Sequence, residues 1–219
     1  CWNSAIPFAT PYEPGSPSDR WQIAVPVSYM SMTCANGFAQ KLAGEISDEL
    51  DMPAPSLNAH VNIIEHAERR RKIKFIQGRA RGIQVENDLD YPRSRPEHIR
   101  DERDPKRAIQ AVVSNGLEGV IYGVDHAYRA NLDPRHSLLE NREEFKTHLR
   151  TVHLSGSKTD HGLISDDDHE FWDLADFISK NVERDVVFCL DLNPKEMGMM
   201  SSDAQIDYLE GLIGKLEKY

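Results

Sequence analysis

Four apolar segments of the chain end in a side chain that binds divalent metals well. Glu86 follows residues 83–85, Asp125 follows 120–124, His153 follows Val152, and Asp191 follows 187–190. A buried carboxylate needs a compensating charge, because an isolated buried charge is very costly. A divalent cation supplies that charge, and oxygen with imidazole ligation suits Mn, Fe, Zn or Mg rather than a thiolate site. The sequence therefore predicts one metal site with these four ligands.

The elements that carry these residues alternate along the second half of the chain. We expect strands at 82–86, 119–125, 149–154 and 185–191, and helices at about 104–116, 168–180 and 203–217. Asp104 and Pro105 are a typical N-cap and first helical residue, and Gly116 closes that helix. The acidic residues 165–168 favour a helix start over a metal site. In the last helix, Ile206, Leu209, Ile213 and Leu216 are expected to face inward.

Strands that alternate with helices predict a parallel sheet covered by helices. The carboxyl ends of parallel strands lie at one edge of such a sheet, which would bring the four candidate ligands together. A doubly wound sheet and a (β/α) barrel both fit this pattern. The sequence has no GxGxxG or GxxxxGK[ST] motif, which disfavours a doubly wound sheet that binds nucleotides.

The first half of the chain is less regular. Residues 1–20 are rich in proline and predict an extended arm, 21–27 a short strand, 37–50 a helix, and 57–81 a basic, mostly helical stretch on which His60 and His66 are exposed. We expect a single domain overall, made of an arm with the first elements at 1–55 and the sheet-forming part at 56–219. The chain begins with Cys1 rather than Met, which predicts a processed or incomplete N-terminus.

Composition limits the possible partners. The 219 residues are 39% hydrophobic with a net charge of -10, which disfavours a general nucleic-acid surface. No apolar run approaches the ~18 residues that cross a bilayer. The three cysteines, Cys1, Cys34 and Cys189, are far apart and predict neither a disulfide framework nor a zinc knuckle. A small-molecule substrate and a reducing cytoplasm are the simplest expectations, and a homo-oligomer stays open.

Four segments together resemble a known superfamily. They are Gly-Ile-Gln-Val-Glu86-Asn, Gly-Val-Asp125-His126, Thr-Val-His153-Leu-Ser-Gly-Ser and Cys-Leu-Asp191. In order and spacing they are similar to the last strands of the xylose-isomerase-like TIM-barrel superfamily, over about residues 60–217. That superfamily includes sugar isomerases and epimerases, endonuclease IV and a branch of iron-dependent enzymes that modify peptides. The resemblance implies a (β/α) barrel, short or incomplete at its N-terminus.

The resemblance also implies roles for individual residues. Glu86, Asp125, His153 and Asp191 would bind the metal, Glu86 and Asp191 would move a substrate proton, and His161 would be a second ligand or an acid/base group. The chain departs from the pattern where Asp191 stands in place of the usual Glu, and where His126 directly follows Asp125 while Tyr128 occupies the usual His position.

The leading functional expectation is a divalent-metal-dependent isomerase or epimerase acting on a small polyol, keto sugar or related acid. The candidate substrate-binding residues are Arg93, Arg95, Lys158 and His126. Alternatives are a phosphodiesterase similar to endonuclease IV, an iron enzyme acting on a peptide, and a non-catalytic barrel subunit that binds a partner. One bound ion per chain favours isomerisation, two or three favour the other enzymes, and none favours the non-catalytic subunit.

Overall fold

The computed structural model describes residues 21–23, 45, 48, 56–61, 64–65, 82–88, 104–157, 161–182 and 186–219. The predicted arm at 1–20, most of the predicted helix at 37–50, and the predicted stretch at 66–81 with His66 lie outside these residues. Glu45 and Asp48, the described members of 37–50, are helical.

Six strands form one sheet in which every neighbouring pair is parallel. They are β1 (Trp21–Ile23), β2 (Leu57–His60), β3 (Ile83–Glu86), β4 (Gly119–Gly123), β5 (Leu149–Leu154) and β6 (Val187–Leu190). Their order across the sheet is β1-β6-β5-β4-β3-β2. The direction never reverses between β2 and β6, so the described strands do not have the doubly wound order, which reverses at a switch point.

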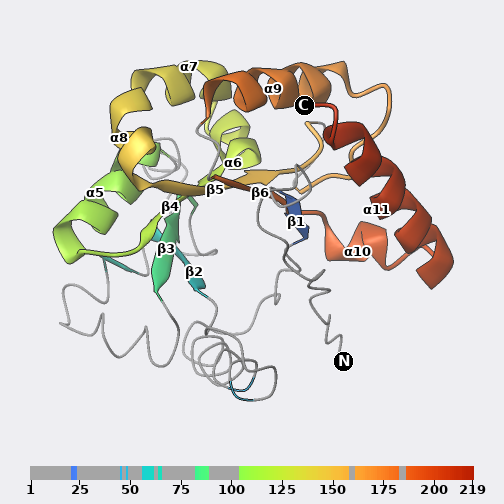
Figure 1. The fold of residues 1–219 in the computed structure, drawn as a ribbon, viewed down its shortest axis with the longest axis horizontal. Helices are drawn as coiled ribbons and strands as arrows, with labels where there is room; N and C mark the ends of the chain where they lie inside the picture. The colour runs from blue at the N-terminus through green and yellow to red at the C-terminus, as the bar shows by residue number, and fades with distance from the viewer. Residues whose placement is uncertain are drawn as a thin grey trace.

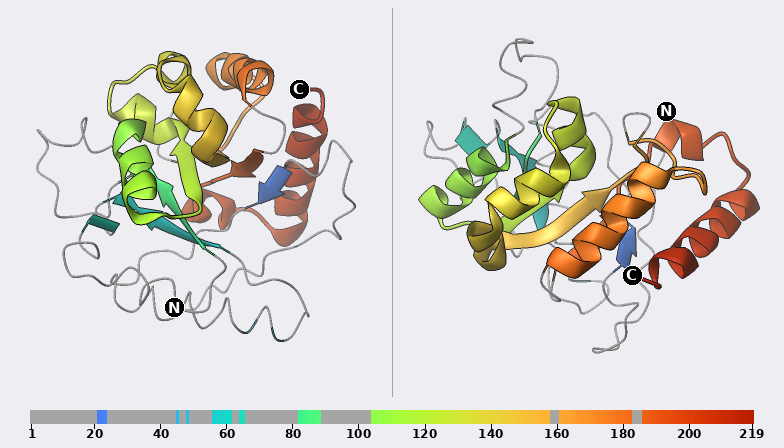
Figure 2. Two further views of the ribbon diagram at one scale, coloured as in Figure 1. Left: turned by 60° about the vertical axis from the view of Figure 1, so that its left-hand side comes forward. Right: turned by 90° about the horizontal axis from the view of Figure 1, so that it is seen from above.

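The helices cover the outer side of this sheet. They are α5 (Pro105–Asn115), α6 (Val124–Arg129), α7 (Pro134–Glu140), α8 (Arg142–His148), α9 (His169–Asn181), α10 (Pro194–Met197) and α11 (Ser202–Leu216). In Figure 1 they form an arc from α5 on the left, through α7, α8 and α9 at the top, to α11 on the right. The turned views in Figure 2 keep α5, α8, α9 and α11 on that same side of the strands.

Local sequence signals explain where several helices begin and end. The side chain of Asp104 accepts a hydrogen bond from the Lys106 N–H, and Pro105 follows it as the first helical residue, as predicted. Gly116 ends α5 in the left-handed conformation, with a φ of 60°, which is the usual glycine C-cap. Asp168 likewise caps α9 by accepting a hydrogen bond from the Phe171 N–H. The acidic stretch before α9 is thus a helix start, as expected.

Three expectations about the elements are wrong. The segment Leu57–His60 is a strand, because the Leu57 N–H bonds to the Gly82 C=O and the segment pairs with β3, a tertiary contact that overrides local helix preference. The strand expected at 119–125 ends at Gly123, because Val124 and Asp125 begin α6, the first of three helices before β5. Ile206, expected to face inward, is 53% exposed, whereas Leu216 is buried as expected and α11 also buries Leu212.

The core lies between the sheet and this layer of helices. Strand residues such as Val85, Val120, Tyr122, Val152 and Phe188 are buried against helix residues such as Ala108, Val112, Phe145, Leu174 and Ile178. All five residues of β4 are buried, as expected for a strand covered on both faces. Within the described part of the chain, no helix combines the length and apolar character needed to cross a membrane.

Candidate metal centre

Three strands and one helix start deliver the predicted ligands to the same edge of the sheet. Glu86 is the last residue of β3, His153 lies in β5 next to its end, and Asp191 follows β6 directly. Asp125 lies in the first turn of α6, directly after β4. Because the sheet is parallel, these positions share its carboxyl edge. All four are buried, with exposed fractions between 2% and 8%.

The described His, Asp and Glu residues form two groups that could each hold a metal ion. Glu86, His153 and Asp191 form the first group, and Asp125, His126 and His161 form the second. Within each group the candidate ligand atoms lie within 4.8 Å of one another. The four ligands predicted for one ion are therefore divided between two groups, and the second is completed by two histidines.

The two groups join into one closed ring in which carboxylates and imidazoles alternate. Glu86 Oε1 lies 2.8 Å from His153 Nδ1, which lies 3.4 Å from Asp191 Oδ2. His161 Nδ1 lies 3.6 Å from Asp191 Oδ2 and 3.1 Å from Asp125 Oδ2. His126 closes the circle, with Nδ1 3.7 Å from Asp125 Oδ2 and Nε2 3.3 Å from Glu86 Oε1. We call these six residues the ring. Three negative side chains are thus each flanked by two imidazoles.

The ring shifts the pKa of its members in opposite directions. Burial acts to raise the pKa of Asp125, but His126 and His161 lower it to about 2. Burial acts to lower the pKa of His126, but Asp125, Asp88 and Glu86 raise it to about 10. The neighbouring Asp125 carboxylate raises the pKa of His161 to about 9. In the metal-free ring, His126 and His161 are therefore protonated at neutral pH.

Glu86 and His153 form the tightest pair of the ring. Burial opposes ionisation of both groups, yet His153 lowers the pKa of Glu86 and Glu86 raises the pKa of His153. The Glu86 Oε1 and His153 Nδ1 atoms are 2.8 Å apart, which is a charge-assisted hydrogen bond. The first group is therefore held in place by its own charges.

Several buried atoms of the ring have no hydrogen-bond partner. They are Asp125 Oδ2, His126 Nδ1, His161 Nδ1 and Asp191 Oδ1. Asp125 Oδ2 and His161 Nδ1 form an ion pair at 3.1 Å, without the alignment of a hydrogen bond. Buried polar atoms are normally paired. The donor set, its burial and these unpaired atoms fit a divalent cation.

Residues outside the ring fix the position of Glu86 and of α6. Asn58 of β2 donates a 2.6 Å hydrogen bond to Glu86 Oε2. Asn87 accepts from the Gly123 N–H at 2.7 Å and donates to the Gly123 C=O at 3.3 Å, which ties the end of β3 to the start of α6. A Cβ on Gly123 would lie 2.5 Å from His126 Cδ2 and 3.1 Å from Glu86 Oε1. The close approach of these two ring members thus requires glycine.

His60 and Asp88 extend the ring on the side of β2. His60 Nε2 lies 3.9 Å from both Glu86 Oε2 and Asp88 Oδ2, and Asp88 Oδ1 lies 3.6 Å from His126 Nδ1. The expectation of an exposed helical His60 is wrong, since it ends β2 with a side chain that is 29% exposed. The alternation of Leu57, Asn58, Ala59 and His60 is the signal that could have identified this strand.

The predicted substrate-binding residues have different outcomes. His126 is 3% exposed and belongs to the ring, where it contacts three carboxylates. Arg93, Arg95 and Lys158 lie outside the described residues.

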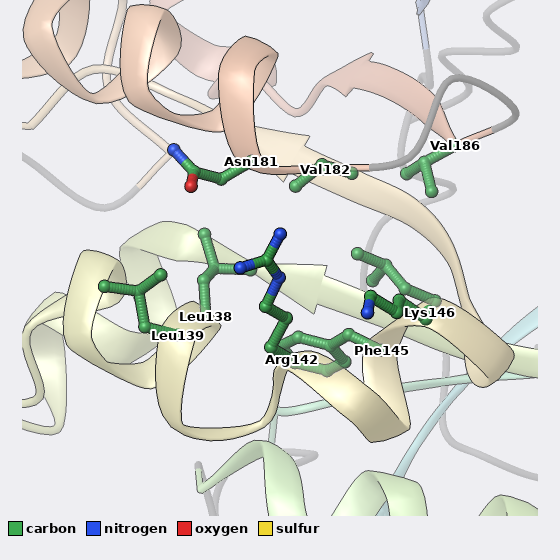
Figure 3. A pocket seen from close by; sticks show the side chains of 9 residues that line it. Leu138, Leu139, Arg142, Phe145, Lys146, Asn181, Val182 and Val186 are labelled. Atoms are coloured by element: carbon green, nitrogen blue, oxygen red, sulfur yellow. The ribbon is translucent and has the colours of Figure 1, made fainter.

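A small pocket lies far from the ring. It has a cavity volume of about 20 Å³ and is lined by residues of α7, α8 and the end of α9 (Figure 3), together with Leu149 and Val186. Leu149 begins β5, whereas His153 lies near its end. The pocket is therefore at the amino edge of the sheet and contains none of the candidate residues.

The comparisons with known proteins add no relative. No protein-family model, curated protein or solved structure matches this chain significantly. The function of this chain must therefore be inferred from the ring and from the strands that position it.

Proposed function

We propose that this chain is a divalent-metal-dependent enzyme whose ring binds two ions, one in each group. The alternation of three buried carboxylates with three imidazoles is the observation that carries this proposal. Four buried ring atoms lack a hydrogen-bond partner, and a bound cation would give them one. Three imidazoles among six ligands favour Zn, Mn or Fe over Mg, which prefers oxygen.

We also propose that the described sheet is part of a closed barrel. Strands β2 to β6 follow in chain order, and the last strand pairs with the first, as barrel closure requires. The helices lie on one side of the strands (Figure 1), which supports this arrangement, because repeated right-handed crossovers in one direction place every helix on the same face. A pairing that joins β1 to β2 would complete the circle.

The geometry favours hydrolysis of a small ester, such as a phosphoester, over isomerisation. Two neighbouring ions supply an activated water and a binding point for an anionic oxygen. An isomerase instead needs a carboxylate that exchanges a proton with substrate. Glu86 is poorly placed for that task, because Oε1 contacts His153 and His126 while Oε2 accepts from Asn58.

Isomerisation of a small polyol or keto sugar is the second candidate. One observation favours it: Glu86, His153 and Asp191 form a group of their own that could hold a single ion. Asp191 Oδ1 is buried and has no hydrogen-bond partner, so this oxygen could exchange a proton with a substrate bound there. Asp191 would then take the proton-transfer role alone.

Metal analysis of protein purified without chelators tests the two-ion proposal. We expect about two ions per chain in the wild type and about one in either His153→Ala or His161→Ala. His136→Ala is the matched control, because His136 lies on α7 with a side chain that is 76% exposed. Iron as the only bound metal would support the peptide-modifying alternative, and no bound ion in the wild type would support the non-catalytic subunit.

Activity assays then separate the two reactions. Protein loaded with Zn or Mn should hydrolyse bis(p-nitrophenyl) phosphate, and His161→Ala should lose this activity with the second ion. If a one-ion protein instead exchanges solvent deuterium into a keto sugar, isomerisation replaces hydrolysis as the proposal.

A further inference from the structure

His161 reaches the ring differently from its other members. It lies in the connection between β5 and α9, with a side chain that is 24% exposed. Its φ of 50° is in the left-handed region. That conformation costs a non-glycine residue about 1 kcal/mol or more. Contacts elsewhere must therefore hold this backbone in place.

Backbone groups of residues 161–164 are hydrogen-bonded to the C-terminal part of the chain and to Gly156, which follows β5. The His161 C=O accepts from the Asn193 N–H, the Gly162 C=O accepts from the Gly156 N–H at 2.8 Å, and the Leu163 N–H donates to Glu196 Oε2 at 3.3 Å. Asn193 lies two residues after Asp191, and Glu196 is in α10. The segment with His161 is thus hydrogen-bonded to residues that follow Asp191, a member of the first group.

Tyr208 of α11 makes two hydrogen bonds to this segment through one hydroxyl group. Its hydroxyl accepts from the Ile164 N–H at 2.8 Å and donates to the Ile164 C=O at 3.1 Å. Ile164 is 3% exposed, so loss of this single oxygen would leave two backbone groups without their partner in a buried place. Because Ile164 is three residues from His161, relaxation there is transmitted directly to the ligand.

We propose that Tyr208 is a positioning residue for the second metal group: its hydroxyl fixes residues 161–164 and thereby aims His161 at Asp125 and His126. This inference rests on the proposed two-ion function. The C-terminal helix α11 then controls occupation of the second group, while the first group is independent of it, since Glu86, His153 and Asp191 are placed by strand ends.

The test is a Co²⁺ titration of the full chain, followed by visible absorption. The wild type should bind two ions, and Tyr208→Phe should keep one affinity and weaken the other about 10- to 100-fold, the usual effect of losing a partner that orients a ligand. The affected ion should be the one that His161→Ala removes. Equal affinities in Tyr208→Phe and the wild type would overturn the inference.

A second variant separates positioning from general destabilisation of α11. Leu212→Ala truncates a residue that is 4% exposed on the same helix. It should lower the melting temperature at least as much as Tyr208→Phe and leave both Co²⁺ affinities unchanged. If Leu212→Ala weakens the second ion to the same extent, Tyr208 has only a structural role and the inference fails.

A metal-free measurement keeps the inference testable if the two-ion function is wrong. In NMR spectra without metal, Tyr208→Phe should shift the ring resonances of His161, speed amide exchange at Ile164, and leave His153 unmoved. A wild type that binds no Co²⁺ would refute the proposed function alone, whereas an unshifted His161 would refute the role of Tyr208.

Discussion

The carboxylates of the ring stay charged because each one lies between two imidazoles. Each of Glu86, Asp125 and Asp191 is flanked by two imidazoles at distances between 2.8 and 3.7 Å. Buried carboxylates without such neighbours would take up protons rather than stay charged. The metal-free ring is therefore a set of compensated charges that a cation can enter by displacing protons.

Gly123→Ala should disrupt the ring without disturbing the rest of the sheet. The added Cβ would lie 2.5 Å from the ring carbon Cδ2 of His126, so the imidazole must move away from Glu86. We expect the loss of one ion per chain, measured by metal analysis. Gly211→Ala is the control, because that Cβ meets open space on α11 and should stabilise the fold by about 0.5–1 kcal/mol. Full metal content in Gly123→Ala would contradict the described approach of His126 and Glu86.

Metal affinity should rise with pH up to about pH 10, the raised pKa of His126. The pKa values of His126 and His161 are raised to about 10 and 9, so both imidazoles carry protons at pH 7 in the metal-free protein. A metal binds the neutral imidazole and must displace those protons. Raising the pH removes this competition and lowers the apparent Kd. Calorimetry in buffers with different ionisation enthalpies should show proton release, and a titration without it would contradict the charged ring.

At the scale of elements, strand ends fix the first metal group and connections fix the second. Asp125 and His126 depend on the start of α6, and His161 depends on the segment before α9. Asp168 anchors that segment: it is 2% exposed and accepts from the Ser157 N–H at 2.9 Å, from the Ser157 hydroxyl at 2.6 Å, and from the Phe171 N–H.

Asp168→Ala should therefore cost more than the loss of an ordinary helix cap. We expect a loss of about 2–3 kcal/mol in the free energy of unfolding, because the buried Phe171 N–H and two donors of the half-buried Ser157 lose their acceptor. Ser201→Ala removes the exposed cap of α11 and should cost about 1 kcal/mol. Urea denaturation of both variants measures the difference. Equal losses would mean that Ser157 contributes nothing to holding the connection.

The sequence predicts the secondary-structure elements better than the tertiary contacts between them. Residues 149–154 and the cap of α9 are confirmed, because an apolar strand and an Asp N-cap are local signals. His60 is harder to recognise, since the alternation of residues 57–60 is short and the charged run after it suggests a helix, whereas pairing with β3 makes it a strand. The division of the ligands into two groups follows from how β4 leads into α6, which no local pattern specifies.

At the scale of the whole molecule, metal binding should raise thermal stability. An ion that binds the folded chain alone stabilises it by about 2.7 kcal/mol at 100 times its Kd. We expect Zn²⁺ or Mn²⁺ to raise the melting temperature and a chelator to reverse the rise. A variant with both His153→Ala and His161→Ala should show no shift. A shift that persists in this variant would place the stabilising ion outside the ring.

The pairing of β1 with β6 has a consequence for how the chain is made. Trp21 leaves the ribosome long before its sheet partner Phe188 is made. Contacts so distant in sequence slow folding. Asp191 follows β6 directly, so the six-residue ring cannot be complete until residues 187–191 have been made.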